Sequence, residues 1–211
     1  MEKISIIILG ESGVGKTSII YRIIKKDDIE LAATIACSFS SLSKYYKKKN
    51  YNEIKYEFYD TGGAENFNSL TKSYIRGRDI VLLVFCNLDT LEVLINRWYE
   101  FIRDNADISK TKFIVVANKS DSFGEDYEVI KLRGKEFARE IDAFFITCSA
   151  KSKENIDNLE DHIEYEAIKI IEQREEQRKK DNCNQGNKKN NKSIVIDMKN
   201  LEANNDRKCV C

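Results

Sequence analysis

A glycine-rich segment between an apolar run and an amphipathic segment constrains the fold of this chain most strongly. Residues 10–18 read Gly-Glu-Ser-Gly-Val-Gly-Lys-Thr-Ser and fit the pattern G-x-x-x-x-G-K-[ST]. The preceding run Lys3–Leu9 predicts a buried strand, and Thr17–Lys26 predicts a helix. Glycines let successive backbone N–H groups point at one anion, and the helix presents its positive end to the same anion. The segment therefore predicts a phosphate-binding loop.

Two residues of this loop and two residues beyond it are expected to act together on a nucleotide and Mg²⁺. Lys16 is expected to reach the outer phosphates, and the Thr17 hydroxyl to ligate the metal. Asp60 is expected to hold the same ion through its waters, and the Gly63 N–H to contact a terminal phosphate. A plain turn is the alternative for this Asp-Thr-Gly-Gly sequence. The loop residues expected to contact nucleotide are Glu11, Ser12, Gly13, Val14, Gly15, Lys16, Thr17 and Ser18.

The rest of the chain alternates apolar runs with helical patterns. Further strands are expected at about 39–47, 53–59, 80–86, 113–117 and 144–148. Further helices are expected at 91–105, 131–141 and about 153–177. This alternation predicts an α/β fold, a mostly parallel sheet with helices on both faces. Each polar motif follows the carboxyl end of a strand, where such sheets bind ligands. Trp98 is expected in the core of this fold.

Residues 118–121, Asn-Lys-Ser-Asp, bear on which base is bound. A carboxylate at Asp121 can accept from the N1–H and 2-amino groups of guanine, and adenine offers neither. Asn118 is expected to brace the loop and meet the base edge, and the aliphatic stem of Lys119 to lie on the base. The Ala150 N–H, after the last strand, can reach guanine O6. A charged loop without such a role is the alternative.

Composition divides the chain into a globular body and a polar tail. Hydrophobic residues make up 42% of the 211 residues, which suffices for a core. Residues 1–177 are expected to form one domain, and 178–211 a disordered tail. The tail segment 178–208 has nine Lys or Arg and four Asp or Glu, which suits an anionic membrane surface better than nucleic acid as partner. A general abundance of Lys and Asn would produce the same asymmetry.

Cysteine usage and the first residues bear on the compartment. The six Cys and the single His show no metal-site spacing, so no Cys/His metal site is expected. The first strand follows Met1 directly, which predicts no signal peptide, and the apolar run 80–86 is too short to cross a bilayer. An intracellular protein with reduced thiols is expected.

Together these motifs resemble those of the Rab family of small GTPases in the Ras superfamily. The resemblance covers residues 3–172 and the last three residues. It rests on Gly10-x4-Gly15-Lys16-Thr17, Thr34-Ile35, Asp60-Thr61-x-Gly63, Tyr74-Ile75-Arg76-Gly77, Asn118-Lys119-x-Asp121 and Ser149-Ala150-Lys151. It implies a P-loop NTPase small G domain with a six-stranded sheet and five helices, switch segments at 28–40 and 60–76, and a GTP/GDP cycle. By position, Thr34 would close on Mg²⁺ and the γ-phosphate.

The second switch departs from the family pattern. Rabs usually read Asp-Thr-Ala-Gly-Gln-Glu where this chain has Asp-Thr-Gly-Gly-Ala-Glu, so Ala64 stands where Gln orients the attacking water. A methyl group neither donates nor accepts hydrogen bonds, which predicts slow hydrolysis and no assigned catalytic residue. Another group or a partner could instead position the water. Ala36 also replaces a Gly, and Phe39, Tyr59 and Tyr74 stand where Rabs keep three effector-facing aromatics, Tyr59 replacing Trp.

The end of the chain, Cys209-Val210-Cys211, is typical of Rabs in which both thiols receive geranylgeranyl groups. Two lipid chains are what stable anchoring requires. The resemblance therefore implies the cytoplasmic face of an intracellular membrane with a cytosolic pool, in vesicle trafficking. It also implies an exchange factor, an activating protein, escort and dissociation-inhibitor proteins, and effectors at the switches. The apolar patch 194–196 either docks on escort proteins or is a chance cluster.

Three functions remain open from the sequence. The first is a slow, membrane-anchored GTP/GDP switch. The second is an interaction scaffold that binds GTP constitutively, a reading that Ala36 and Ala64 keep open. The third is an unrelated P-loop ATPase or kinase, against which Asn118 and Asp121 and the short chain argue. Preference for guanine over adenine separates the third from the others.

Overall fold

The computed structural model describes residues 2–24, 37–44, 54–62, 75–105 and 108–205. Over 37–44 and 182–205 the description is of the backbone. Contacts divide the chain into two units, residues 1–168 and 169–211. The first unit contains the sheet and every motif described below.

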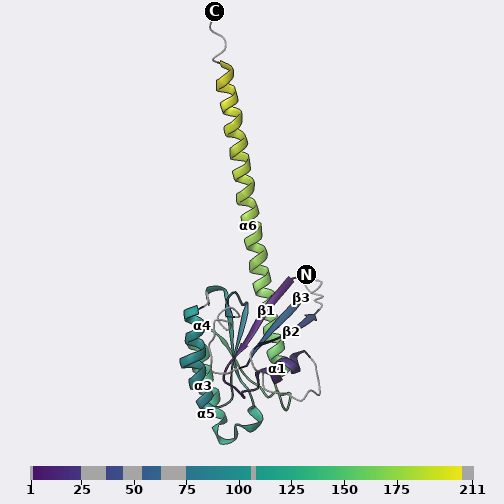
Figure 1. The fold of residues 1–211 in the computed structure, drawn as a ribbon, viewed down its shortest axis with the longest axis vertical. Coiled ribbons are helices and arrows are strands. Elements are labelled where there is room, and N and C mark those ends of the chain that lie inside the picture. The colour runs from purple at the N-terminus through teal and green to yellow at the C-terminus, as the bar shows by residue number, and fades with distance from the viewer. Residues whose placement is uncertain (1, 25–36, 45–53, 63–74, 106–107, 206–211) are drawn as a thin grey trace, which may run out of the picture. The chain divides into compact units, whose positions relative to one another are not determined.

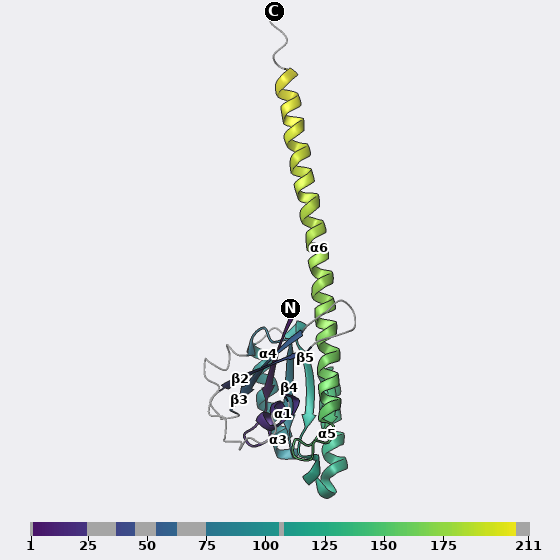
Figure 2. The ribbon, with the colours of Figure 1, turned by 90° about the vertical axis from the view of Figure 1, so that its right-hand side faces the viewer.

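The sheet confirms the predicted α/β fold (Figure 1). Its strands are β1 (Glu2–Leu9), β2 (Cys37–Lys44), β3 (Ile54–Thr61), β4 (Ile80–Phe85), β5 (Lys112–Ala117) and β6 (Phe144–Thr147). They lie in the order β2-β3-β1-β4-β5-β6. In this spatial order β3, β1, β4, β5 and β6 pair in parallel. The remaining strand, β2, pairs antiparallel to β3 at one edge. Figure 2 shows β2 and β3 at one side of the sheet and β5 toward the other.

Helices cover both faces of this sheet. They are α1 (Lys16–Ile23), α3 (Leu88–Val93), α4 (Glu100–Asn105), α5 (Tyr127–Glu140) and α6 (Ile156–Asn205), with the π-helical segment η1 (Leu94–Tyr99) between α3 and α4. Short 3₁₀ turns are η2 (Ile108–Lys110), η3 (Ser120–Ser122) and η4 (Gly124–Asp126). The run α3-η1-α4 and α5 lie on one face, and α1 with the first turns of α6 on the other (Figure 1).

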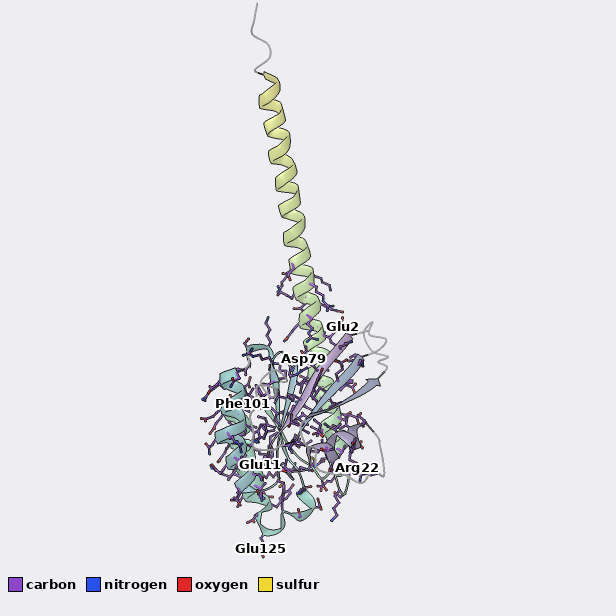
Figure 3. All side chains as sticks on the ribbon, in the orientation of Figure 1. Glu2, Glu11, Arg22, Asp79, Phe101 and Glu125 are labelled. Atoms are coloured by element: carbon purple, nitrogen blue, oxygen red, sulfur yellow. The ribbon has the colours of Figure 1, made fainter. Side chains whose placement is uncertain are left out.

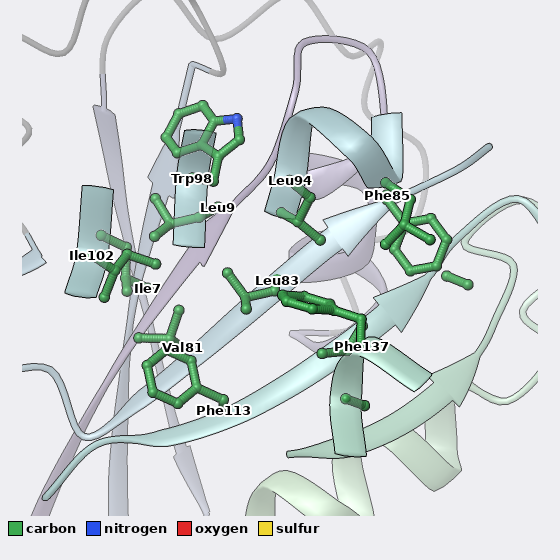
Figure 4. Close-up of a cluster of buried hydrophobic side chains, with 14 of the residues drawn as sticks. Ile7, Leu9, Val81, Leu83, Phe85, Leu94, Trp98, Ile102, Phe113 and Phe137 are labelled. Atoms are coloured by element: carbon green, nitrogen blue, oxygen red, sulfur yellow. The ribbon is translucent and has the colours of Figure 1, made fainter. Parts of the chain in front are cut away.

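The core on the α3–α5 face is built from alternate residues of the strands (Figure 4). A strand points successive side chains to opposite faces, so Ile7 and Leu9 enter this core while Ile6 and Ile8 point to the α1 face. The residues facing this core include Val81, Leu83 and Phe85 of β4, Phe113 of β5, and Leu94, Trp98, Ile102 and Phe137 from the helices. Trp98 is 2% exposed, which confirms its predicted place in the core.

The helix predicted over 91–105 begins earlier and is less regular than expected. The Asn87 side chain accepts from Thr90 N at 2.8 Å, and Thr90 Oγ1 accepts from Asn87 N at 3.0 Å. This reciprocal capping satisfies backbone donors at the helix start, so α3 begins at Leu88. The helix then widens to π geometry over η1.

The last helix runs beyond its predicted end near 177 and continues to Asn205. Residues 178–205 are rich in Asn, a weak helix former, but contain no Pro and a single Gly, so the sequence sets no strong helix stop there. The domain boundary at 177 and the disorder of 178–211 in solution remain predictions. Among the described residues, no helix combines the length and apolarity needed to cross a membrane.

Candidate functional site

The glycine-rich loop joins β1 to α1, as the motif predicts. Gly15 precedes α1 with φ +94°, a conformation that favours glycine. A Cβ on Gly15 would lie 2.3 Å from Asn118 Nδ2, and one on Gly10 would lie 2.1 Å from Val84 O. Real Cβ atoms do not approach that closely, so both positions need Gly because the loop packs directly on its neighbours. The loop is thereby held against the carboxyl ends of β4 and β5.

Lys16 is folded back over the loop. Its ammonium Nζ donates to Gly10 O and to Glu11 O, both at 2.9 Å. Burial lowers its pKa to about 8, and the carboxylates of Asp60 and Glu11 act in the opposite direction. The side chain is 5% exposed. A buried cation is therefore placed inside the loop, where the sequence predicts contact with the outer phosphates.

Thr17 and Asp60 meet from opposite sides of the site. Thr17 Oγ1 donates to Asp60 Oδ2 at 2.6 Å. Asp60 lies near the end of β3, paired with Ile8 of β1, and is 3% exposed. The next residue, Thr61, donates through Oγ1 to Ile8 O at 2.8 Å and fixes this strand end. Hydroxyl and carboxylate oxygens are ligands that Mg²⁺ accepts, so this pair fits the predicted metal position.

Asn118 joins the phosphate loop to the two base-recognition loops. Its Nδ2 donates to Val14 O at 2.8 Å, and its Oδ1 accepts from Ala150 N at 3.1 Å. Oδ1 also accepts from the Cys148 thiol at 3.8 Å. The side chain is 1% exposed. Asn118 therefore joins three loops, where the sequence predicts that it braces its own loop, and its Oδ1 occupies the Ala150 N–H that the sequence assigns to guanine O6.

The carboxylate of Asp121 is oriented by the loop after β6. Ser149 Oγ donates to Asp121 Oδ1 at 2.5 Å, and Lys151 Nζ lies 3.9 Å from Oδ2. Ser149 Oγ in turn accepts from Ser152 N at 3.0 Å. Lys119, between the two motif residues, adopts a left-handed φ of 66°. The motif predicted that these residues share a site, and the structure adds that Ser149 aligns the carboxylate.

Two arginines that no motif contains also contact the site. Arg22 Nε on α1 donates to Ala150 O at 2.8 Å. Arg97 Nη1 on η1 lies 4.0 Å from Glu11 Oε2 in the phosphate loop. Figure 3 labels Glu11 and Arg22 among the side chains. Single-sequence patterns carry no signal for either contact, because each partner lies far along the chain.

Several predicted site residues lie outside the described part of the chain. These are Thr34, Gly63, Ala64, Cys209 and Cys211. Of the three predicted effector-facing aromatics, Tyr59 is described with its side chain. The Arg78 guanidinium lies 3.7 Å from the centroid of the Tyr59 ring. This stacking fixes one face of the ring beside the start of β4.

Comparison with known proteins agrees with this geometry. Residues 5–169 match the family model described as Ras family. The chain belongs to the Ras family. It is 31% identical over 172 residues to Ras-related protein RABC2b of Arabidopsis thaliana, covering 79% of each chain. It is 30% identical over 169 residues to RABC2a of the same plant, covering 79% of this chain and 77% of that protein.

A fungal relative is similar to a comparable extent. The chain is 29% identical over 171 residues to Ras-related protein SEC4 of Candida albicans, covering 80% of this chain and 77% of that protein. The relatives and the family match together confirm the resemblance drawn from the motifs: this is a small GTPase of the Rab type.

Proposed function

We propose that this Rab-family chain binds GTP and GDP with Mg²⁺ and acts as a membrane-anchored switch in vesicle trafficking that hydrolyses GTP slowly. The observation that carries the proposal is the joining of loops after β1, β5 and β6 by one buried amide, that of Asn118. This amide links a phosphate-binding motif to a guanine-selective motif, which a chance match of either motif would not produce.

On the phosphate side, the chain's own groups supply charge and oxygen ligands. The Lys16 ammonium, which donates to two loop carbonyls in this structure, would turn toward outer phosphate oxygens. Mg²⁺, when bound, would neutralise charge on the phosphates, and Thr17 and Asp60 would hold it. Thr34 and Gly63 would complete this side in the GTP state. The remaining contacts would be the backbone N–H groups of residues 11–18.

On the base side, Asp121 accepts from the N1–H and 2-amino groups of guanine while Ser149 keeps the carboxylate aligned. The stem of Lys119 would lie on the base, and the Ala150 N–H, which donates to Asn118 Oδ1 in this structure, would turn to O6. Lys151 Nζ lies 3.9 Å from the second oxygen of Asp121, and its side chain is exposed to solvent. A base without both guanine donors would leave Asp121 unpaired, which is the physical basis of the proposed selectivity.

Slow hydrolysis and anchoring rest on the sequence. Ala64 stands where the family uses Gln, and its methyl group cannot align a water for in-line attack. Geranylgeranyl groups on Cys209 and Cys211, aided by the basic tail, would hold the chain on an anionic cytoplasmic membrane face. Exchange factors, activating proteins, escort and dissociation-inhibitor proteins, and effectors would act on it there.

The test is single-turnover hydrolysis of bound GTP with Mg²⁺, for wild type beside Ala64→Gln. We expect Ala64→Gln to hydrolyse about tenfold to hundredfold faster, because misplacement of a reacting group costs factors of this size. Ala64→Leu is the matched control, since it enlarges the side chain without a hydrogen-bonding group, and it should stay at the wild-type rate.

Equal rates for wild type and Ala64→Gln would contradict the proposed slow hydrolysis, because another group would then serve the water. If neither protein hydrolyses bound GTP, the chain acts as a constitutively GTP-bound scaffold and the switch is refuted. Failure of wild type to retain GTP in preference to ATP would refute the proposed function as a whole.

A further inference from the structure

Arg22 makes a long-range contact that the nucleotide motifs do not include. It lies in the last turn of α1, and its Nε donates to Ala150 O across 128 positions of sequence at 2.8 Å. We propose that Arg22 is a positioning residue that fixes Ala150 against the guanine base and thereby sets how long a guanine nucleotide stays bound. This inference rests on the proposed function, and the experiment below separates the failure of one from that of the other.

Ala150 is held at both of its backbone groups. Its N–H donates to Asn118 Oδ1 at 3.1 Å, and its C=O accepts from Arg22 at 2.8 Å. The residue is 5% exposed, so water does not readily replace either bond. Asn118 also donates to Val14 O at 2.8 Å. Removal of the Arg22 donor would free one side of Ala150 while the Asn118 side stayed in place.

These contacts close a ring between the two ends of the nucleotide site. Val14 and Arg22 belong to one continuous segment, the phosphate loop followed by α1, and Asn118 and Ala150 join its two ends. The distance between the phosphate loop and the base loop is therefore fixed at two points. A nucleotide that spans both ends gains from this preorganisation, because less ordering remains to be done on binding.

The helix that carries Arg22, α1, is anchored in the core. Ile19, Ile20 and Ile23 are buried in the α1 face of the core, at 0%, 1% and 2% exposure. A helix anchored by three buried side chains does not shift without loss of core contacts. The position of Arg22 relative to the phosphate loop is consequently set by the fold, and its guanidinium transmits that position to Ala150.

The test compares Arg22→Met, which keeps an unbranched apolar stem but has no donor, with Arg22→Lys, which keeps a cationic donor. Arg139→Met on α5 is the matched control, because Arg139 is exposed and lies in the last turn of its helix, as Arg22 does in α1. Dissociation of GDP and of 6-thio-GDP is timed from the full-length proteins with Mg²⁺. Sulfur at position 6 is a weaker acceptor than oxygen, and the analogue keeps the N1–H and the 2-amino group.

We expect Arg22→Met to release GDP about threefold to tenfold faster than wild type, the value of one hydrogen bond. The acceleration should be smaller for 6-thio-GDP, because the position of Ala150 matters less where atom 6 of the base is a weaker acceptor. Arg22→Lys should lie between Arg22→Met and wild type, and Arg139→Met should match wild type. Thermal unfolding of each protein without added nucleotide accompanies these rates.

Two results would overturn the inference. One is GDP release from Arg22→Met at the wild-type rate. The other is equal acceleration of GDP and 6-thio-GDP release, because a merely structural role of Arg22 would affect both nucleotides alike. If Arg22→Met does not fold, the same comparison on Arg22→Lys decides. Wild type that retains GDP no better than ADP would refute the proposed function itself. Wild type that retains GDP while the Arg22 variants behave like it refutes the role of Arg22 alone.

Discussion

Replacement of Asn118 by Ala tests the central contact of the site. The change removes the amide that donates to Val14 O and accepts from Ala150 N, and both partners then lie buried without that bond. Each buried polar group left without a partner costs about 1–3 kcal/mol, so the two together predict a loss of about 2–6 kcal/mol in the free energy of unfolding. The weak thiol contact from Cys148 adds little.

Urea unfolding followed by tryptophan fluorescence measures this loss directly. Trp98 is the one Trp in the sequence and is buried, so its emission reports loss of the core. The measurement is made without added nucleotide, because a ligand that binds the folded state adds its own stabilisation. An expected loss of this size is a large fraction of a typical domain stability of about 5–15 kcal/mol.

The matched control is Asn96→Ala. Asn96 is exposed, and its Nδ2 contacts Glu92 Oε2 at 3.3 Å within the same helical run. Its replacement should change the free energy of unfolding by about 0.5 kcal/mol or less, as surface substitutions usually do. If Asn118→Ala is destabilised no more than Asn96→Ala, the loops do not depend on this amide, and the argument for one joined site fails.

Two further outcomes follow from the loop geometry and from burial. Gly15→Ala should lower the melting temperature and weaken GDP binding far more than Gly13→Ala. Both glycines have positive φ, but only a Cβ at Gly15 meets an atom, Asn118 Nδ2 at 2.3 Å. Equal effects of the two changes would mean that backbone strain alone matters. Burial lowers the Lys16 pKa to about 8 from 10.5. As pH rises, the folded chain therefore loses this proton at a lower pH than the unfolded chain does, and protonation opposes folding below pH 8. The free energy of unfolding of wild type relative to Lys16→Met should therefore rise between about pH 8 and pH 10.5 in urea titrations, and a pH-independent difference would contradict the burial argument.

The strands were predictable because apolar runs in this chain are short and bounded by polar residues. β1, β4 and β5 match the runs expected from sequence within one residue at each end. Helix limits were less predictable. The start of α3 depends on the two reciprocal hydrogen bonds between Asn87 and Thr90. In the sequence alone, these two polar residues are typical of a turn. α5 begins at Tyr127, ahead of the expected 131, and its first turn places Ile130 in the core.

The sequence by itself determined the loop, the order of strands and helices, and which polar residues follow which strand. These features depend on near neighbours, where glycine freedom, apolar spacing and propensity act. Tertiary structure alone decided that Ser149 aligns Asp121, that Asn118 holds both Val14 and Ala150, and that Arg22 reaches Ala150. Those partners lie 28 to 128 positions apart, and parallel strands bring them together at one edge of the sheet. A hydrogen bond acts over a few ångströms of space, so the folded distance decides it and the distance along the chain does not.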